Sequence, residues 1–154
     1  MKCLLLISVV FLPACNSQTE TKSENTADTL KNSVETSAPT INGCYTSILK
    51  QDTATLKINE NGSAVSGDLT YNRFEKDSNK GIFEGEIKDS LIIGDYTFQS
   101  EGKSSVRQVV FKISGANLIE GYGDINMNND TATFKNISQL NYQYDQPFIK
   151  TDCK

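Results

Sequence analysis

Residues 53–72 read TATLKINENGSAVSGDLTYN, and this stretch decides the fold. On both sides of Asn61-Gly62 the apolar residues occupy every second position. Such alternation around an Asn-Gly pair is the strongest short signal for an antiparallel β-hairpin, because the pair forms the tight turn that twisted strands require. A two-residue turn at Asn61-Gly62 predicts that Ile58 faces Val65 on the buried side of the hairpin.

The same alternation continues along the chain on both sides of this hairpin. Turn residues separate the segments, and no helical run lies between them. The predicted strands cover residues 44–49, 53–59, 65–71, 83–88, 92–98, 109–113, 118–125 and 131–135. About eight consecutive strands at this spacing predict an all-β domain built as an antiparallel up-and-down meander. A closed or nearly closed barrel is favoured, because closure removes the exposed edges of a sheet.

The interior of such a barrel can be filled by side chains or can hold one small ligand. Gly67, Gly85 and Gly94 fall at inward-facing positions of the predicted strands. They either permit tight curling of the strands or leave room for a small apolar molecule, and curling is the commoner reason for glycine in a strand.

The composition excludes several classes of function. The 154 residues include no His, which removes the Ser-His-Asp and Cys-His nucleophile systems and the usual zinc and haem ligand sets. With 15 Lys and Arg residues against 19 Asp and Glu residues, the chain carries a net charge of −4. Such a chain repels a phosphate backbone, so we expect no nucleic acid partner.

The start of the chain has the features of an export signal. Met1-Lys2 is positively charged, and residues 3–12 are apolar except for Ser8 but fewer than the ~20 residues that a membrane span needs. Leu12-Pro13-Ala14-Cys15 then resembles the lipobox of bacterial lipoproteins, with Pro13 in place of the commoner Ala, Ser or Thr. The resemblance implies that residues 1–14 are a signal peptide and that a lipidated Cys15 anchors the chain in a membrane. The alternative is a secreted soluble protein whose cleavage site happens to precede a cysteine.

Residues 15–41 contain the lipidated Cys and a linker rich in Ser, Thr and Asn. So few aliphatic side chains cannot bury enough apolar surface to offset the entropy of ordering, so we expect a disordered tether. The folded domain then spans residues 42–154. We expect a lipid anchor in the cell envelope, at the outer membrane. Whether the domain faces the periplasm or the outside stays open, because residues 16–20 include a single acidic side chain.

Two cysteines remain for the folded domain once Cys3 and Cys15 are set aside. Cys44 and Cys153 lie near the two ends of the domain, and an exported protein folds in an oxidising compartment. A disulfide between them is therefore predicted. The alternative is a reactive free thiol.

Residues 75–81, 94–102 and 120–124 resemble segments of small lipoproteins of Bacteroidota. The resemblance covers about half of the domain. It implies a lipoprotein whose domain is similar in shape to the lipocalin-like barrels of the calycin type, and it implies no particular activity. Function therefore has to be argued from a site.

The polar loops of the predicted meander gather at one end, because every second turn falls at the same end. Loops at the end of a rigid barrel are where such scaffolds place binding residues. Arg107 alternates with Val109 and Phe111, so it should point inward, toward Glu101 or Asp124. The candidate binding rim consists of Asp52, Glu75, Lys76, Asp77, Glu101, Arg107 and Asp124. The alternative is a solvated cluster of ion pairs with no role in binding.

Residues 124–130 place oxygen-bearing side chains at the spacing that opens a calcium loop. The match then fails, because the twelfth position is Lys135 where a calcium loop has a bidentate Glu. An Asn-rich turn is the preferred interpretation, and we expect no metal and no cofactor.

Three classes of function remain, and we expect a non-enzymatic one. The first is a membrane-anchored envelope lipoprotein whose domain binds a small ligand or an envelope partner. The second is an inhibitor or interaction module that acts through residues 75–81, and its acidic charge suits a basic target. The third is a glycan hydrolase with paired carboxylates such as Glu75 and Glu101.

Overall fold

The computed structural model describes residues 40–100 and 102–153 of the chain. The expectations for the signal peptide, Cys15 and the tether, and for Glu101, lie outside the described residues. Within them, no helix is long and apolar enough to cross a membrane. The elements are β1 (Gly43–Leu49), β2 (Asp52–Asn61), β3 (Ala64–Asn72), β4 (Asn79–Lys88), β5 (Leu91–Ser100), β6 (Lys103–Ser114), β7 (Asn117–Tyr122), β8 (Ile125–Asn128), β9 (Thr131–Phe134), a 3-10 turn (Ile137–Gln139), β10 (Asn141–Tyr142) and β11 (Ile149–Thr151).

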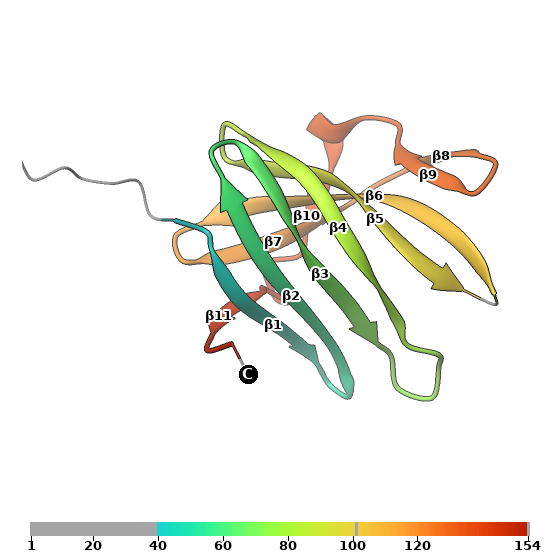
Figure 1. The fold of residues 1–154 in the computed structure, drawn as a ribbon, viewed down its shortest axis with the longest axis horizontal. Helices are drawn as coiled ribbons and strands as arrows, with labels where there is room; N and C mark the ends of the chain where they lie inside the picture. The colour runs from blue at the N-terminus through green and yellow to red at the C-terminus, as the bar shows by residue number, and fades with distance from the viewer. Residues whose placement is uncertain (1–39, 101, 154) are drawn as a thin grey trace, which may run out of the picture. The chain divides into compact units, whose positions relative to one another are not determined.

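The first seven strands form the expected antiparallel meander, each pairing with the next along the chain (Figure 1). The all-β prediction is confirmed, and the sheet is largely antiparallel. One pairing is parallel, where Val106 of β6 lies opposite Thr131 of β9.

The sheet has eleven strands, more than the eight expected. The predicted strand over residues 118–125 is divided, because β7 ends at Tyr122 and β8 begins at Ile125 to form a separate hairpin with β9. The other additional strands, β10 and β11, have two and three residues, which is too short to show an alternating pattern.

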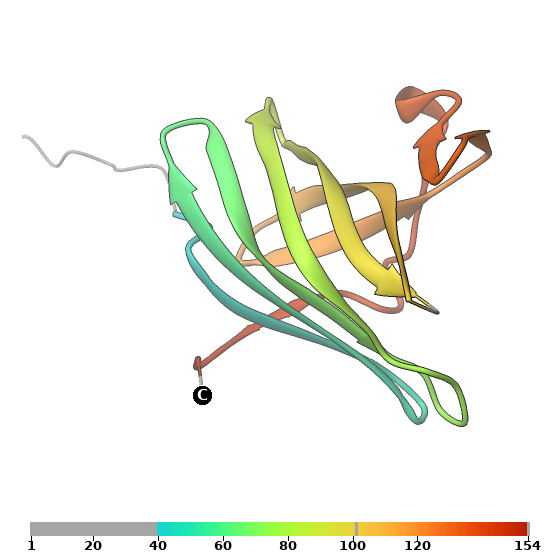
Figure 2. The same ribbon diagram turned by 45° about the vertical axis from the view of Figure 1, so that its right-hand side comes forward.

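The two ends of the sheet are β10 and β11, and the ladder of strand pairs does not close into a ring. β11 pairs with β1, while β10 pairs with the end of β7. Between the ends lies one isolated bridge, in which Leu118 of β7 and Phe148 exchange two backbone hydrogen bonds of 3.0 and 2.8 Å. The sheet is strongly curved, as Figure 2 shows, and side chains of β3 and β7 meet across its concave side.

The turn of the first hairpin differs from the prediction by one position. Its turn residues are Gly62 and Ser63, so Ile58 pairs with Gly67 and the prediction that it faces Val65 is wrong. Gly62 has φ +64°, and a glycine with positive φ at the first turn position gives the type II′ geometry that suits a hairpin. The slip moves each partner by two residues, so the same apolar side chains still face the interior.

The concave side of the sheet is filled by large side chains. Phe83 and Phe111 are fully buried and pack edge to face, with ring centroids 5.8 Å apart. Phe148 packs on Phe111 in the same way at 5.2 Å, so the segment before β11 contributes to the core. The fully buried side chains are Tyr45, Leu56, Ile58, Leu69, Phe83, Ile92, Tyr96, Val109, Val110, Phe111, Leu118 and Phe148.

The strand glycines lie where neighbouring backbones approach closely. Gly85 and Gly94 are direct partners on β4 and β5, and a Cβ added to Gly94 would lie 2.8 Å from the Cα of Gly85. A Cβ added to Gly67 would overlap the carbonyl of Lys57 on β2. Contacts with backbone leave no room for a ligand at these positions, so the structure favours the curling interpretation.

A disulfide joins Cys44 to Cys153, as predicted, with Cα atoms 5.1 Å apart. Cys44 lies in β1, opposite Thr151 of β11. The bond therefore links the first strand of the domain to the residues that follow its last strand.

Candidate functional site

The turns of the meander divide between the two ends of the curved sheet. One end carries Lys50-Gln51, residues 73–78 and the turn between β5 and β6, and we call it the loop end. The opposite end carries the tight turns at residues 62–63, 89–90 and 115–116. The longest loop of the meander lies at the loop end, where the sequence placed the candidate rim.

The structure ties two of the rim loops together. Asp52, at the start of β2, accepts a hydrogen bond of 2.8 Å from the backbone N–H of Phe74. Glu75, Lys76 and Asp77 follow Phe74 and are exposed. Asp52 therefore holds the 73–78 loop against the β1–β2 turn.

Asp124 lies apart from these residues, in the connection between β7 and β8. Its partner is Lys135, at 3.8 Å, and both side chains are exposed. An exposed ion pair of this kind contributes little to stability. Asp124 is thus not part of a cluster with Arg107.

Arg107 points inward, as its alternation with Val109 and Phe111 predicts, but Asp124, one of its two predicted partners, pairs with Lys135 instead. The other predicted partner, Glu101, lies outside the described residues. Nη2 of Arg107 lies 3.8 Å from Oε1 of Glu120, and its Cζ lies 4.9 Å from the centre of the Tyr71 ring. Glu120 comes from β7, which lies across the interior from β3. A sequence signal for Glu120 existed, because it alternates with the apolar Leu118 and so faces the core.

Glu120 is held as an acceptor between two phenols. The hydroxyls of Tyr71 and Tyr122 each donate to one of its carboxylate oxygens, both at 2.7 Å, and only 5% of the residue is exposed. Burial, followed by the negative charge of Glu120, raises the pKa of Tyr71 and of Tyr122 well above the usual range. Both phenols therefore stay protonated at neutral pH and remain donors.

Two other buried donors close to this cluster have no hydrogen-bond acceptor among the described residues. They are the hydroxyl of Tyr96 and Nη2 of Arg107, which belong to residues directly opposite each other on β5 and β6. Burial raises the pKa of Tyr96 to about 12, although the charge of Arg107 acts in the other direction. The phenol of Tyr96 is thus a donor as well.

A cavity of about 70 Å³ opens beside this cluster at the loop end. Tyr71 and Glu120 are the buried residues of its wall, while Leu49, Arg73 and Tyr122 line it and are exposed. Two of its lining side chains are apolar and exposed, Leu49 and Tyr122, and the exposed Phe74 directly follows Arg73, which also lines it. The arrangement combines an apolar margin with a polar floor, which is the usual character of a binding site.

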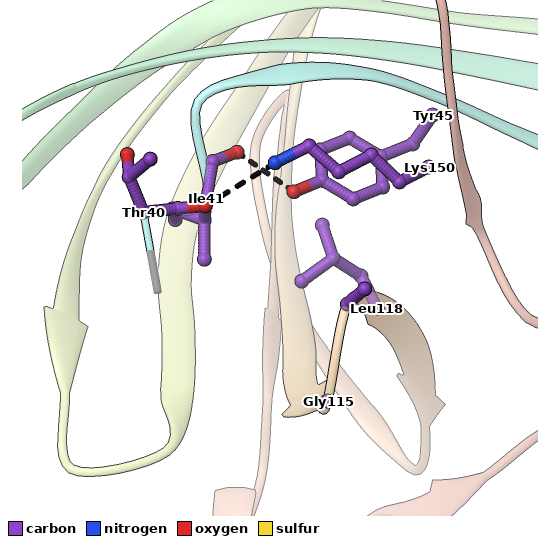
Figure 3. A pocket seen from close by; sticks show the side chains of 7 residues that line it. Thr40, Ile41, Tyr45, Gly115, Leu118 and Lys150 are labelled. Carbon is purple, nitrogen blue, oxygen red and sulfur yellow. Dashed lines mark hydrogen bonds between the residues drawn. The ribbon is translucent and has the colours of Figure 1, made fainter. Parts of the chain in front are cut away.

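A second cavity, of about 110 Å³, lies at the opposite end between β1, β7 and β11 (Figure 3). Its polar groups bond to one another: Tyr45 donates to the carbonyl of Ile41 at 2.8 Å, and Lys150 donates to the carbonyl of Thr40 at 3.2 Å. These bonds fix the start of the domain against β11. We assign this cavity a structural role.

Residues 124–130 form β8 and a turn at Asn129-Asp130, where Asn129 has φ +53°. The turn is thus limited to Asn129-Asp130, while residues 125–128, expected to be part of it, belong to strand β8. Across residues 40–100 and 102–153, no group of three or more His, Cys, Asp or Glu side chains is arranged to hold a metal ion.

No protein-family model, curated protein or solved structure matches this chain. The site must therefore be interpreted from its own geometry. The features that this geometry offers are the clamped carboxylate of Glu120, the unpartnered donors of Arg107 and Tyr96, and the apolar margin around the cavity.

Proposed function

We propose that this chain is a lipid-anchored lipoprotein of the cell envelope whose β domain binds an envelope protein through the loop end, without catalysis. The anchor rests on the export signal and the lipobox-like stretch that ends at Cys15. The binding role rests on the apolar margin around the loop-end cavity.

One observation carries the choice of a protein over an enclosed small ligand: the interior is filled. Aromatic and aliphatic side chains occupy the concave side of the sheet, and the loop-end cavity of about 70 Å³ is small beside the ~300 to 1,000 Å³ of ordinary ligand pockets. A partner that covers the exposed margin and inserts a single group into the cavity fits these dimensions. Exposed apolar side chains grouped on one surface are typical of such interfaces.

The 73–78 loop is the longest connection between strands at the loop end. Its Phe74 is 53% exposed, and the bond from its backbone N–H to Asp52 fixes the position from which the side chain projects. The alternative of an inhibitor or interaction module uses residues 75–81, of which 75–78 lie in this loop and 79–81 begin β4. It differs only in what the partner does.

We also infer that the domain acts as a nearly closed barrel. The segment from Phe148 to Cys153 supports it, because Phe148 forms a bridge to Leu118 of β7 while β11 pairs with β1 and the disulfide joins Cys153 to β1. A scaffold restrained in this way holds its loops at fixed positions, which lowers the cost of ordering them on binding.

Replacing Cys15 by serine tests the anchor. We expect the wild-type chain to sediment with the membrane fraction of the cell that makes it, and the Cys15→Ser variant to be found in the soluble fraction, because the acyl chains that hold the protein are lost. Immunoblots of the two fractions measure the ratio. Equal membrane fractions for both chains would show that Cys15 is not the anchor.

Replacing Phe74 by serine tests the binding surface. We expect cross-linking in intact cells to recover at least about tenfold less of one discrete envelope protein with Phe74→Ser than with the wild-type chain, because a central aromatic contact contributes more than ~1.4 kcal/mol. Ile82→Ser is a matched control, since Ile82 is 52% exposed but belongs to β4, where its side chain lies on the opposite side of the strand from the buried Phe83. Equal recovery from the two variants would contradict the proposal.

A further inference from the structure

Two buried hydrogen-bond donors face the interior near the loop end without an acceptor. The hydroxyl of Tyr96 belongs to a residue that is 1% exposed, and Nη2 of Arg107 is buried although 36% of that side chain is exposed. The two residues are partners in the β5–β6 ladder, so their side chains lie on the same face as direct neighbours. Buried polar atoms in native proteins nearly always have a partner.

The described side chains nearby do not supply this partner. The carboxylate of Glu120 already accepts one phenol on each oxygen, and its nearest oxygen is 3.8 Å from Nη2 of Arg107, beyond hydrogen-bond distance. Tyr71 lies against the Arg107 guanidinium with its ring, while its hydroxyl is directed to Glu120. The cluster thus contains four donor side chains around one carboxylate. Among the described residues, it lacks a second acceptor for Tyr96 and Arg107.

The chemistry of the two free donors specifies that acceptor. Arg107 carries a permanent positive charge, and a planar guanidinium is the side chain best suited to carboxylates. Tyr96 adds a neutral donor that stays protonated throughout the physiological range. A charged and a neutral donor side by side match an oxyanion more closely than they match a neutral carbonyl.

We propose that Arg107 and Tyr96 form a subsite for a carboxylate group at the loop end. The proposal rests on the proposed function, because it names the chemical group that the binding partner inserts. Arg107 would then stand between two carboxylates, Glu120 and the incoming one, which its five N–H groups allow. Neither residue lines the loop-end cavity, but 36% of the Arg107 side chain is exposed, so the guanidinium is in contact with solvent.

Acetate is the probe that tests the subsite on the full chain in detergent. We expect acetate to raise the unfolding midpoint by about 5 °C or more when its concentration is a hundred times its Kd. Acetamide has the same shape without the charge and should leave the midpoint unchanged, and so should chloride at equal ionic strength. An acetate response that acetamide or chloride reproduces would overturn the proposal, and so would no response to acetate, which would leave the two donors to ordered water.

Two variants locate the response. Tyr96→Phe removes only the unpartnered hydroxyl, so we expect it to fold with an unchanged midpoint and to lose most of the acetate shift. Arg107→Gln should lose the shift entirely, whereas Arg73→Gln, which changes an exposed arginine at the same end, should keep it. A shift that persists in both Tyr96→Phe and Arg107→Gln would place the anion elsewhere and overturn the proposal.

The source of the carboxylate is settled by repeating the cross-linking with Tyr96→Phe. If the carboxylate belongs to the partner protein, this variant should recover less partner, and added acetate should compete with the wild-type chain. If a free organic acid fills the subsite, recovery should be unchanged while the acetate shift is still lost. Loss of recovery in Phe74→Ser with no acetate response would reject the subsite and keep the proposed function.

Discussion

Replacing both Cys44 and Cys153 by serine is expected to lower the free energy of unfolding by about 4 to 5 kcal/mol. The disulfide closes a loop with a sequence separation of 109 residues, and in the chain-entropy model a loop of this length restricts the unfolded chain strongly. The loss is a large part of the ~5 to 15 kcal/mol by which a domain is usually stable. Urea denaturation of the wild-type chain and the double variant measures the difference.

The control for this prediction keeps the sequence and removes only the bond. The Cys15→Ser chain with and without reductant isolates the Cys44–Cys153 disulfide, because in that chain Cys15 cannot contribute. We expect reduction to lower the urea midpoint to nearly that of the double serine variant. If the oxidised and reduced chains unfold at the same urea concentration, the bond does not stabilise the domain.

Replacing Gly94 by alanine is expected to cost about 3 kcal/mol of stability. The added Cβ would lie 2.8 Å from the Cα of Gly85 and 2.8 Å from Cζ of Phe83. Phe83 is fully buried against Phe111, so it has no free space into which to move. Either β4 and β5 separate locally or the aromatic core repacks, and both are unfavourable.

Asp95→Ala is the matched control for Gly94→Ala. Asp95 is the next residue on β5, and its side chain is exposed on the convex side of the sheet. We expect its substitution to change stability by less than about 0.5 kcal/mol in the same urea experiment. A Gly94→Ala domain as stable as Asp95→Ala would show that the two strands are not held at the close distance the structure gives.

The strand order could be predicted from sequence because it depends on local chemistry. Alternation identifies each strand of the meander, and the short polar segments between them, such as Asp89-Ser90, identify the turns. In the first hairpin, the position of the turn was predicted to within one residue. Asn61-Gly62 correctly located the turn, but the chain uses Gly62-Ser63, and local sequence did not distinguish the two.

The site was less predictable, because its contacts cross the interior. Alternation predicted that Arg107 lies on the inner face, because the direction of a side chain depends only on the sequence of its own strand. The neighbouring Tyr71 comes from β3 and meets Arg107 only because the sheet curves, whereas Glu120 comes from the adjacent β7, where its direct partner in the ladder is Phe111. The amount of curvature depends on close contacts such as Gly85 with Gly94, which pattern and spacing do not measure.

The pairing of β1 with β11 determines which strand can pair last as this domain folds. Strands β2 to β7 can add one after another as the polypeptide lengthens, since each needs only the strand before it. The outer edge of β1 can form its hydrogen bonds with β11 only after residues 149–151 have been made. Until then its backbone groups are unpaired and can hydrogen-bond to strands of other chains. Truncations near the carboxyl terminus should therefore aggregate far more than truncations of equal length before Thr40.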